Sequence, residues 1–375
     1  MGKIYTSLGL MSGTSGDGVD ASIISSDGTD GYNEIINEYF KYDQKIYENI
    51  HNLRGQILKS EDLQKNTNEI KNLEKEITLF HAKAVAKILE SVDKKVDFIG
   101  FHGQTIYHNS SEKVSKQIGD GNLLSQLTKK TVVYNFRKND IKNGGEGAPL
   151  APIFHRLIVK HKKIELPVCI LNIGGITNVT SIMEYNKNSF LSRDLGPGNC
   201  LIDEWIRRKT KNKFDNNGDF AKKGKTNDLI LNQALDNFDN RSNKNISSFD
   251  TKDFNLSFVR GLNLEDGAAT LTNFTGKIIE SELINFLSDT KNKPWKILVC
   301  GGGRKNLTLM EKIKNIIPKN WIIQSIDDYG INGDYVESQA FAYFAIRSFL
   351  GLPISFPKTT GCKKPTTGGE IVKNY

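Results

Sequence analysis

The first part of the chain alternates short apolar runs with polar, glycine-rich turns, a pattern typical of strands joined by tight loops. Ile4–Met11 and Gly18–Ser25 are predicted to be two such strands, joined into a β-hairpin by the Gly-, Ser-, Thr- and Asp-rich stretch between them. The same pattern recurs in "LPVCILNIGGITNVTSIME", where an apolar strand, a tip centred on Gly174 and a returning strand follow one another. We therefore expect one glycine-tipped hairpin in each of two domains.

The remaining apolar pattern predicts further strands and helices. Apolar residues recur at helical spacing through Lys59–Val92. "VDFIGFHGQTIYH" is typical of a buried strand that ends in a polar loop, "KTVVYNFR" of another strand, and "KNDIKNGGEGAPLAP" of a long loop. "KILVCGGGRKN" predicts a strand, a turn and the start of a helix, and the polar segment 207–257 is predicted to be rich in loops. Alternating strands and helices indicate an α/β fold.

The size and charge of the chain narrow its class. A chain of 375 residues is long for a single core and suits two domains. We expect one domain to consist of residues 1–140 together with about 345–375, and the other of residues 141–344. The net charge is +8, but the lysines do not form the basic stripe with interleaved aromatic residues that is typical of nucleic-acid binding. The charge instead predicts a solvated surface that attracts small anions such as nucleotides.

The sequence carries no sign of a membrane, a secretory route or a disulfide framework. The apolar run "FAYFAIRSFLGLPI" is interrupted by Arg347 and Pro353, and the N-terminus lacks a signal-peptide pattern. The four cysteines are scattered and have no metal-binding spacing. We expect a cytoplasmic protein with reduced cysteines and no membrane partner.

The glycine-rich loops are candidates for binding phosphate, because glycine lets successive backbone N–H groups approach an anion closely. In the first loop, Thr14 and Ser15 add hydroxyl groups, and Asp17 and Asp20 offer hard oxygen ligands for Mg²⁺, directly or through water. One such loop alone is equally typical of a tight turn, and it matches neither the P-loop nor the dinucleotide fingerprint. Two hairpin tips and the triple glycine near position 300 together predict a single nucleotide site.

The stretch "SRDLGPGNCLIDEW" contains a candidate general base. Asp194 precedes a rigid Gly-Pro-Gly turn, and Asn199 is a predicted N-cap of the following helix. A carboxylate held near the positive end of a helix stays ionised, as a general base requires. Aspartate beside Gly-Pro is also common as a turn or capping residue, so both roles stay open.

Further polar residues are candidates for binding the substrate. His102 and Gln104 lie at the predicted end of a buried strand, where α/β folds bind ligands. Arg137 can bind a carboxylate or phosphate through its two parallel N–H groups, or pair with Asp140. Glu337, on the first turn of a predicted helix together with Asp334, either faces the cleft or stabilises the helix dipole.

Seven motifs, in this order and spacing, resemble those of anhydro-N-acetylmuramic acid kinases: "GLMSGTSGDGVD", "FHGQTIYH", "NFRKNDIKNGGEGAPLAPIFH", "LNIGGITNVT", "RDLGPGNCLIDEW", "VCGGGRKN" and "GDYVESQAFAYFAIRSFLGLP". The resemblance covers nearly the whole chain. It implies an α/β protein of two related RNase H-like domains, as in actin-like ATPases, with an interdomain ATP cleft. It also implies a homodimer.

The resemblance further implies the reaction. Water opens 1,6-anhydro-N-acetylmuramic acid, ATP phosphorylates the freed O6 with Mg²⁺ as cofactor, and the products are N-acetylmuramic acid 6-phosphate and ADP, in cell-wall recycling. Asp194 would be the catalytic base. The ATP site would consist of Gly13, Thr14, Ser15, Gly16, Asp17, Gly18, Val19, Asp20, Gly174, Gly175, Gly301, Gly302 and Gly303, and the sugar site of His102, Gln104, Arg137 and Glu337.

This sequence departs from the family's usual pattern at three site positions. Gly16 stands where leucine is common, Leu195 where threonine is usual, and Glu146 where glutamine is usual. Two other functions share the phosphate loops: a related kinase for a different sugar, and an actin-like or heat-shock-like ATPase that acts on a protein partner. The second should lack a sugar pocket, and the sequence shows no peptide-binding or polymerising insert.

Overall fold

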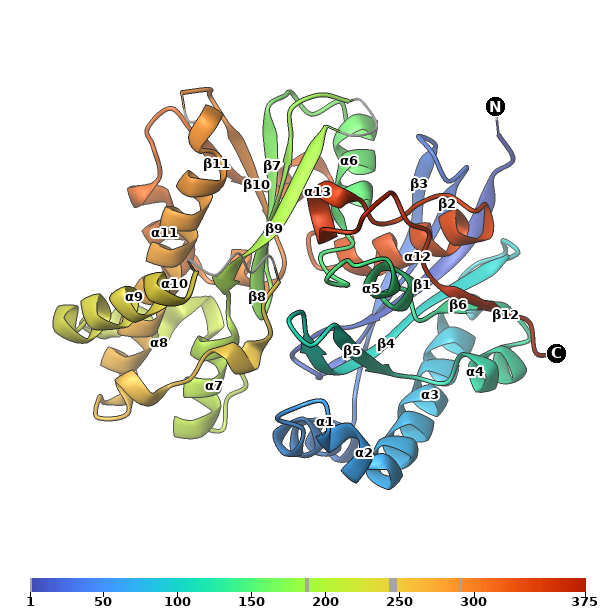
Figure 1. The fold of residues 1–375 in the computed structure, drawn as a ribbon, viewed down its shortest axis with the longest axis horizontal. Coiled ribbons are helices and arrows are strands. Elements are labelled where there is room, and N and C mark those ends of the chain that lie inside the picture. The colour runs from blue at the N-terminus through green and yellow to red at the C-terminus, as the bar shows by residue number, and fades with distance from the viewer. Residues whose placement is uncertain (1, 186–188, 243–247, 291) are drawn as a thin grey trace. The chain divides into compact units, whose positions relative to one another are not determined.

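The computed structural model describes residues 2–185, 189–242, 248–290 and 292–375. The chain forms two compact units (Figure 1). Unit 1 consists of Met1–Ile164 and Asp334–Tyr375, and unit 2 of Glu165–Gly333. Unit 2 is therefore an insertion in the sequence of unit 1.

Unit 1 is built on a mixed sheet with the strand order β12-β6-β4-β1-β2-β3, and β5 pairs with β4 beside it. Strands β1, β2 and β3 are antiparallel neighbours, whereas β4 is parallel to β1 and β6 is parallel to β4. The strands are β1 (Tyr5–Ser12), β2 (Gly18–Ser26), β3 (Tyr32–Lys41), β4 (Phe98–Asn109), β5 (Val114–Ile118), β6 (Thr131–Tyr134) and β12 (Glu370–Val372).

Helices cover both faces of this sheet. On one face α12 contacts β1, β2 and β4, and on the other α1 and α3 bury their apolar side chains against Leu8 and Leu10 of β1. Figure 1 shows α12 lying across β1 and β2. The helices of unit 1 are α1 (Gln44–Gln56), α2 (Asp62–Lys65), α3 (Thr67–Glu90), α4 (Gly121–Thr128), α5 (Lys138–Lys142), α6 (Pro152–His161), α12 (Val336–Phe349) and α13 (Pro357–Thr360).

Unit 2 repeats the same sheet topology. Its strand order is β11-β10-β7-β8-β9, in which β7, β8 and β9 are antiparallel, β10 is parallel to β7 and β11 is parallel to β10. Each unit thus has a three-stranded antiparallel meander followed by two parallel strands on the side of its first strand. The strands are β7 (Val168–Ile173), β8 (Ile176–Ile182), β9 (Phe190–Pro197), β10 (Lys296–Cys300) and β11 (Ile322–Ser325).

One face of the unit 2 sheet packs against α10 and α11, whose Ile279, Leu283 and Ile313 join the buried side chains of β7 and β10. A second cluster joins α7, α8, α9 and α10 around Trp205 and Phe238. The helices are α7 (Cys200–Lys209), α8 (Asp219–Lys223), α9 (Asp228–Ser242), α10 (Leu264–Phe286) and α11 (Leu307–Ile316).

The boundaries of the units differ from the expected ones. Residues 141–164 and 334–344, which we expected in the second domain, belong to unit 1. One reason is that α6 contacts β3, with Lys160 Nζ 2.6 Å from Asp30 Oδ2. The other is that α12 begins at Val336 and packs against the unit 1 sheet.

Both glycine-tipped hairpins and the strand–turn–helix at position 300 are confirmed. Three predictions of loops were wrong. The polar end of "VDFIGFHGQTIYH" continues as strand β4 to Asn109, because β5 pairs with it. The predicted loop after β6 contains the short helix α5. The segment 207–257, which was predicted to be rich in loops, contains the helices α8 and α9. Residues 243–247 of this segment lie outside the described part. The predicted helix at 59–92 consists of α2 and α3.

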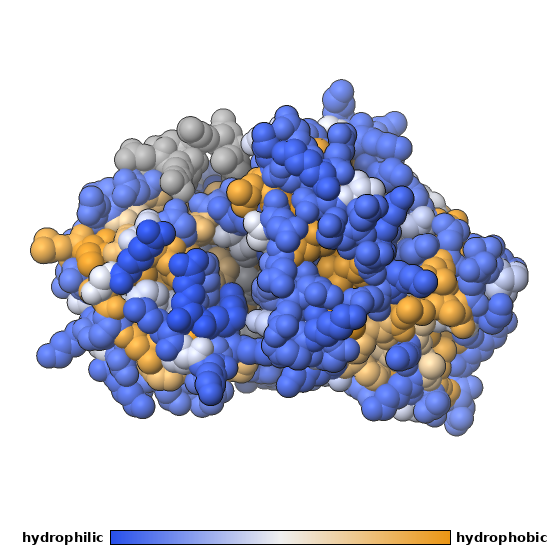
Figure 2. All heavy atoms as spheres, turned by 90° about the horizontal axis from the view of Figure 1, so that it is seen from below, coloured by the Kyte–Doolittle hydropathy of each residue, from blue (hydrophilic) through white to orange (hydrophobic). Residues whose placement is uncertain are grey.

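The surface agrees with the charge of the sequence. Hydrophilic residues cover most of the face shown in Figure 2, and apolar residues form scattered patches. Among the described helices, none is both long and apolar enough to span a bilayer. All four cysteines are free thiols, and Cys169, Cys300 and Cys362 are buried.

A pair of glycines lets α12 approach the sheet. Gly9 of β1 and Gly100 of β4 are directly paired across the two parallel strands. A Cβ atom at Gly9 would lie 1.9 Å from the carbonyl oxygen of Ser338, and one at Gly100 would lie 2.1 Å from that of Phe341. Both oxygens belong to the backbone of α12, which a small side-chain shift cannot move. No side chain larger than hydrogen therefore fits at either position.

We predict that Gly9→Ala lowers the free energy of unfolding by at least about 1–3 kcal/mol, the usual effect of overpacking a core. Urea unfolding followed by circular dichroism measures this change. Gly55→Ala is the matched control, because nothing lies within 4 Å of a Cβ at this position in α1. There alanine should raise the stability by about 0.5–1 kcal/mol. Equal effects of the two substitutions would contradict the close approach of α12.

Candidate functional site

The first glycine loop is the tip Gly13–Asp17 between β1 and β2. The backbone carbonyl oxygens of Gly13, Thr14, Ser15 and Asp17 accept hydrogen bonds, one from within the tip and the others from the rest of unit 1. The Gly13 carbonyl accepts Gly16 N–H (3.1 Å) and Gln104 Nε2 (3.0 Å). The Thr14 carbonyl accepts Arg54 Nη1 (2.5 Å), and the Ser15 carbonyl accepts His51 Nε2 (3.0 Å). The Asp17 carbonyl accepts Tyr42 N–H (2.9 Å) and the Tyr39 hydroxyl (3.0 Å). The carbonyl oxygens are thus turned toward the protein.

Apart from Gly16 N–H, the N–H groups of the same tip are not used in this way. Within the described residues, no acceptor lies within hydrogen-bonding distance of the N–H groups of Thr14, Ser15 or Asp17. The Thr14 and Ser15 side chains are exposed. Successive N–H groups that point away from held carbonyls form a concave site for an anion. Gly16, with φ at +60°, makes the tight turn that this arrangement needs.

Gln104 supports this tip from beneath. Its side chain is fully buried, Oε1 accepts from the Ser12 hydroxyl at 2.6 Å, and Nε2 donates to the Gly13 carbonyl at 3.0 Å. Both ends of the amide are therefore engaged with the hairpin. Gln104 thus contacts the first glycine loop directly. Its expected role in binding the sugar stays a prediction, and these contacts suggest a second role in positioning the loop.

The rest of the first motif lies in strand β2. Val19 is fully buried in the core, and the Tyr39 ring covers Gly18. Asp20 is half-buried and pairs with Met11 across the hairpin.

The carboxylates of Asp17 and Asp20 in the hairpin could supply some of the oxygen ligands that Mg²⁺ needs. Asp17 is half-buried and accepts the Ser15 hydroxyl. Across the described residues, no three His, Cys, Asp or Glu side chains form a metal-binding group. Mg²⁺ in nucleotide enzymes is commonly held by one or two carboxylates together with phosphate oxygens and water. Asp17 and Asp20 fit that donor set, which bound phosphates would complete.

Buried His102 contacts half-buried Arg137. His102 Nδ1 lies 2.8 Å from the Gly103 carbonyl, and Nε2 lies 3.1 Å from Arg137 Nη2. Because arginine only donates, Nε2 must accept and Nδ1 must carry the proton. Burial, and then the Arg137 cation, hold the pKa of His102 well below its ordinary value. His102 is therefore a neutral ring that orients the guanidinium group, which also donates to the Gly147 carbonyl at 2.8 Å.

Asp140 organises the loop that follows α5. Its carboxylate accepts Gly147 N–H at 2.8 Å and the Thr360 hydroxyl at 2.6 Å. Glu146, in the same loop, is anchored through its backbone N–H to the Thr360 carbonyl at 2.8 Å. Glu337 lies in the first turn of α12, whereas Asp334 precedes that helix.

Unit 2 brings three glycine segments together at the carboxyl end of β7. Gly198 N–H donates to the Gly175 carbonyl at 2.9 Å, and Asn199 N–H donates to the Gly174 carbonyl at 2.8 Å. The triple glycine packs against the same strand end, since a Cβ at Gly301 would lie 2.3 Å from Asn172 Oδ1. The second glycine loop, the Gly-Pro-Gly turn and the triple glycine thus lie side by side.

Asp194 lies in β9, immediately before the turn. Only 7% of its surface is exposed, and Oδ2 accepts Phe249 N–H at 2.8 Å. The expected N-cap at Asn199 is confirmed. Its side chain makes no capping hydrogen bond and donates instead to the Ile173 carbonyl. Leu195, beside Asp194, is the extra residue of a β-bulge and packs in the core, so it does not share the environment of the carboxylate.

The triple-glycine turn is fixed by an ion pair that the sequence did not reveal. Arg304 binds Asp327 through Nε at 2.6 Å and Nη2 at 3.2 Å, and its Nη1 donates to the Gly301 carbonyl at 3.0 Å. Burial alone would raise the pKa of Asp327, but hydrogen bonds from Arg304, Gly333 N–H and Ser325 outweigh it and hold the pKa below its ordinary value.

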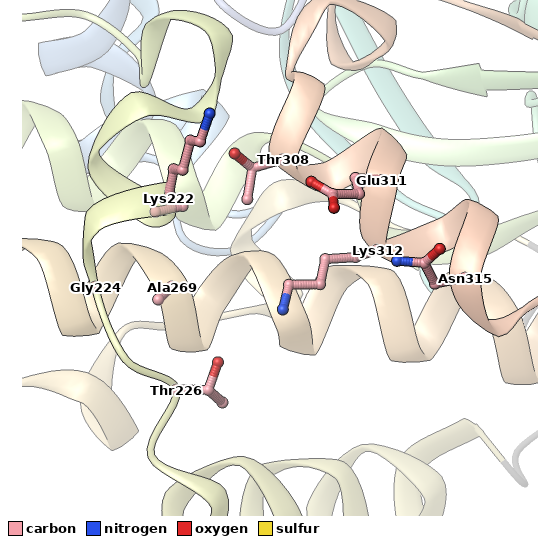
Figure 3. Close-up of a pocket in the computed structure, with 9 residues that line it drawn as sticks. Lys222, Gly224, Thr226, Ala269, Thr308, Glu311, Lys312 and Asn315 are labelled. Atoms are coloured by element: carbon pink, nitrogen blue, oxygen red, sulfur yellow. The ribbon is translucent and has the colours of Figure 1, made fainter.

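A polar cavity of about 190 Å³ lies beside α11 in unit 2. Figure 3 shows Thr308, Glu311, Lys312 and Asn315 on successive turns of α11, with Lys222 of α8 on the opposite wall. The helix begins directly after the triple-glycine turn, but the lining consists of residues from α8, α10, α11 and the α8–α9 connection. The glycine loops of the candidate site lie outside this cavity.

Comparison with known proteins decides the family. The family model described as anhydro-N-acetylmuramic acid kinase matches residues 5–374. The chain belongs to this family. The anhydro-N-acetylmuramic acid kinase of Pelagibacter ubique is 59% identical over 375 residues and covers all of both chains. That of Zymomonas mobilis is 38% identical and covers 97% of this chain and 98% of its own.

Solved structures align more loosely. The hexokinase of Schistosoma mansoni complexed with glucose is 11% identical and has a TM-score of 0.43, covering 91% of this chain and 85% of its own. Membership of the anhydro-N-acetylmuramic acid kinase family makes the protein an enzyme and a kinase.

We predict that Gln104→Leu weakens the affinity for MgATP about tenfold, because the tip loses a buried donor and acceptor, while the Michaelis constant of the sugar changes little. Calorimetric titration and steady-state kinetics measure the two quantities. Gln117→Leu in β5 is the matched control, since its amide contacts Thr105 and Ser115 rather than the tip. A raised sugar Michaelis constant with unchanged ATP affinity would instead make Gln104 a sugar-binding residue.

Proposed function

We propose that the protein is an ATP-dependent kinase that opens 1,6-anhydro-N-acetylmuramic acid with water and phosphorylates O6. The products are N-acetylmuramic acid 6-phosphate and ADP. Two findings support this function: the family match over residues 5–374, and the tip Gly13–Asp17 with its carbonyls held and its N–H groups open to an anion. The second observation carries the proposal, because it accounts for phosphate binding in this chain's own geometry.

The proposed ATP site uses the three glycine loops. The tip Gly13–Asp17 binds phosphate oxygens through its N–H groups, and Thr14 and Ser15 add hydroxyl donors. Gly174 and Gly175 form a second phosphate loop, and Gly301–Gly303 contact the adenosine. Asp17 and Asp20 hold Mg²⁺, which neutralises charge on the transferred phosphoryl group. The shared strand order of the two sheets supports related, RNase H-like units of the actin-like ATPase kind.

Asp194 is the proposed general base. An anhydro sugar has no free O6 hydroxyl, so the base acts on water. A proton passes from water to the Asp194 carboxylate as the water oxygen bonds to C1. The C1–O6 bond breaks, its electron pair stays on O6, and O6 attacks the γ-phosphorus as the bond to ADP breaks. The hydrogen bond from Phe249 N–H fixes the rotamer of the carboxylate for this role.

Arg137 suits the lactyl carboxylate of the muramic sugar, because His102 and the Gly147 carbonyl fix the plane of its guanidinium group. Glu337 remains a proposed sugar ligand. In the cell we propose a cytoplasmic homodimer that acts in peptidoglycan recycling. None of these roles requires a nucleic-acid or membrane partner.

The function is tested with MgATP, a panel of anhydro and amino sugars, and water enriched in ¹⁸O. We predict that 1,6-anhydro-N-acetylmuramic acid gains one water and one phosphoryl group, that ¹⁸O appears at C1, and that the phosphate stays unlabelled. Mass spectrometry of the product measures each point. Label in the phosphate would show that water attacks ATP, and phosphorylation of a different sugar alone would reassign the substrate.

The base is tested by Asp194→Asn, which keeps the shape of the side chain but accepts no proton. We predict that kcat falls by about 10²–10⁴-fold, with the affinity for both substrates largely kept. The release of ADP and the formation of the 6-phospho sugar should fall together, because one base serves both bond changes. Turnover close to that of the wild type would place the base elsewhere, and Glu337 would be examined next.

A further inference from the structure

We propose that Asn178 holds the attacking water together with Asp194, by accepting the second hydrogen of that water at Oδ1. The inference rests on the proposed function, because it concerns the water that opens the sugar ring. Asn178 lies in β8, in the strand that returns from the second glycine loop.

The sheet of unit 2 places Asn178 directly beside Asp194. The two residues are partners across the antiparallel strands β8 and β9. Directly opposed residues have Cβ atoms about 5 Å apart on the same face of a sheet. Asn172 of β7 pairs with Asn178 from the other side, so Asn172, Asn178 and Asp194 form a polar row across three neighbouring strands. Val179 and Leu195, the neighbours of two of these residues, point to the opposite face and join the core.

The side-chain amide oxygen of Asn178 is unsatisfied. This atom, Oδ1, is buried and has no hydrogen-bond partner among the described residues. A buried polar atom without a partner costs on the order of 1–3 kcal/mol. Such an atom beside a proposed general base points to a ligand that supplies a donor.

The next polar row on the same face behaves differently. Thr180 and Ser192 are also partners across β8 and β9, and their hydroxyl oxygens lie 3.3 Å apart. Ser192 further donates to the Val179 carbonyl at 2.6 Å. The polar groups that only support the sheet are thus satisfied within the sheet. The unsatisfied atom occurs one row farther along, where the sheet reaches the Gly-Pro-Gly turn.

The chemistry of the reaction needs a second acceptor at this place. Water has two hydrogens, and Asp194 takes only one of them. If Asn178 Oδ1 accepts the other, both O–H bonds are fixed in direction and a lone pair of the oxygen is aimed at C1. The oxygen then bonds to C1, one proton passes to Asp194, the other hydrogen stays on the new C1 hydroxyl, and the C1–O6 electron pair leaves on O6. Asn178 itself neither gains nor loses a proton.

The first test is Asn178→Leu, which keeps the volume but removes the acceptor. We expect kcat to fall about 10- to 100-fold, the effect of losing one hydrogen bond in the transition state, while the Michaelis constants of sugar and ATP change less than about threefold. The urea midpoint should stay equal or rise, because an unsatisfied amide has been removed. Unchanged kcat, or a loss confined to the sugar Michaelis constant, would overturn the assignment to the water.

The second test is Asn178→Asp, which places a second carboxylate beside Asp194. Two neighbouring carboxylates raise the pKa of one of them, so the acidic limb of the kcat–pH profile should move to higher pH. A profile with an unmoved acidic limb would show that the two side chains do not share a site.

Thr180→Val is the matched control, two residues along the same strand and on the same face. It should leave kcat and the pH profile unchanged. Wild-type enzyme is assayed in parallel with the ¹⁸O label. If the wild type makes no labelled 6-phospho sugar, the proposed function fails; if it does and Asn178→Leu keeps full turnover, only the role of Asn178 fails.

Discussion

The close approach of α12 to β1 and β4 is the contact on which unit 1 depends. Gly9 and Gly100 are paired across these strands, and the backbone of α12 occupies the space that side chains would fill. Because residues 165–333 precede α12 in the sequence, the helix that covers this face comes from the part of unit 1 that follows the inserted unit. The same two strands lead to the site, since β1 runs into Ser12 and Gly13, and β4 runs into His102 and Gln104. The helix α12 packs on the same strands, β1 and β4, that carry the residues beneath the glycine tip.

In both glycine loops, backbone carbonyl oxygens accept hydrogen bonds from other segments of the chain. In unit 1 the carbonyl oxygens of the tip are held by donors such as Arg54 and Gln104. In unit 2 the carbonyls of Gly174 and Gly175 accept N–H groups of Asn199 and Gly198. Carbonyl oxygens repel phosphate, so holding them elsewhere is as necessary as presenting N–H groups. Glycine makes these conformations accessible, but the donors from other elements select one of them.

The sequence predicted the two hairpins and the position of Asp194 well, because glycine tips between apolar runs are local signals. The donors that hold the first tip were missed, since they come from segments distant in sequence. The helix α1, which supplies Arg54, left a usable signal: Asp43 caps it by accepting Ile46 N–H, and Ile46, Ile50 and Leu53 recur on one face. The role of Gln104 could not be predicted, because it depends on β4 continuing past Gly103 to pair with β5.

The polar residues on one face of the unit 2 sheet serve two purposes, stability of the sheet and the proposed reaction. Along the face that carries Asp194, Thr180 and Ser192 satisfy each other, whereas the Asn178 amide is left with a buried oxygen that lacks a donor. An apolar residue of similar volume would remove that cost of about 1–3 kcal/mol. The amide therefore lowers the stability of the fold relative to such a residue. The amide lies opposite Asp194 in the sheet. From there it can orient a water molecule that gives one proton to the base and directs one lone pair at carbon. The sheet therefore tolerates an unsatisfied group at the position where the reaction supplies the missing donor.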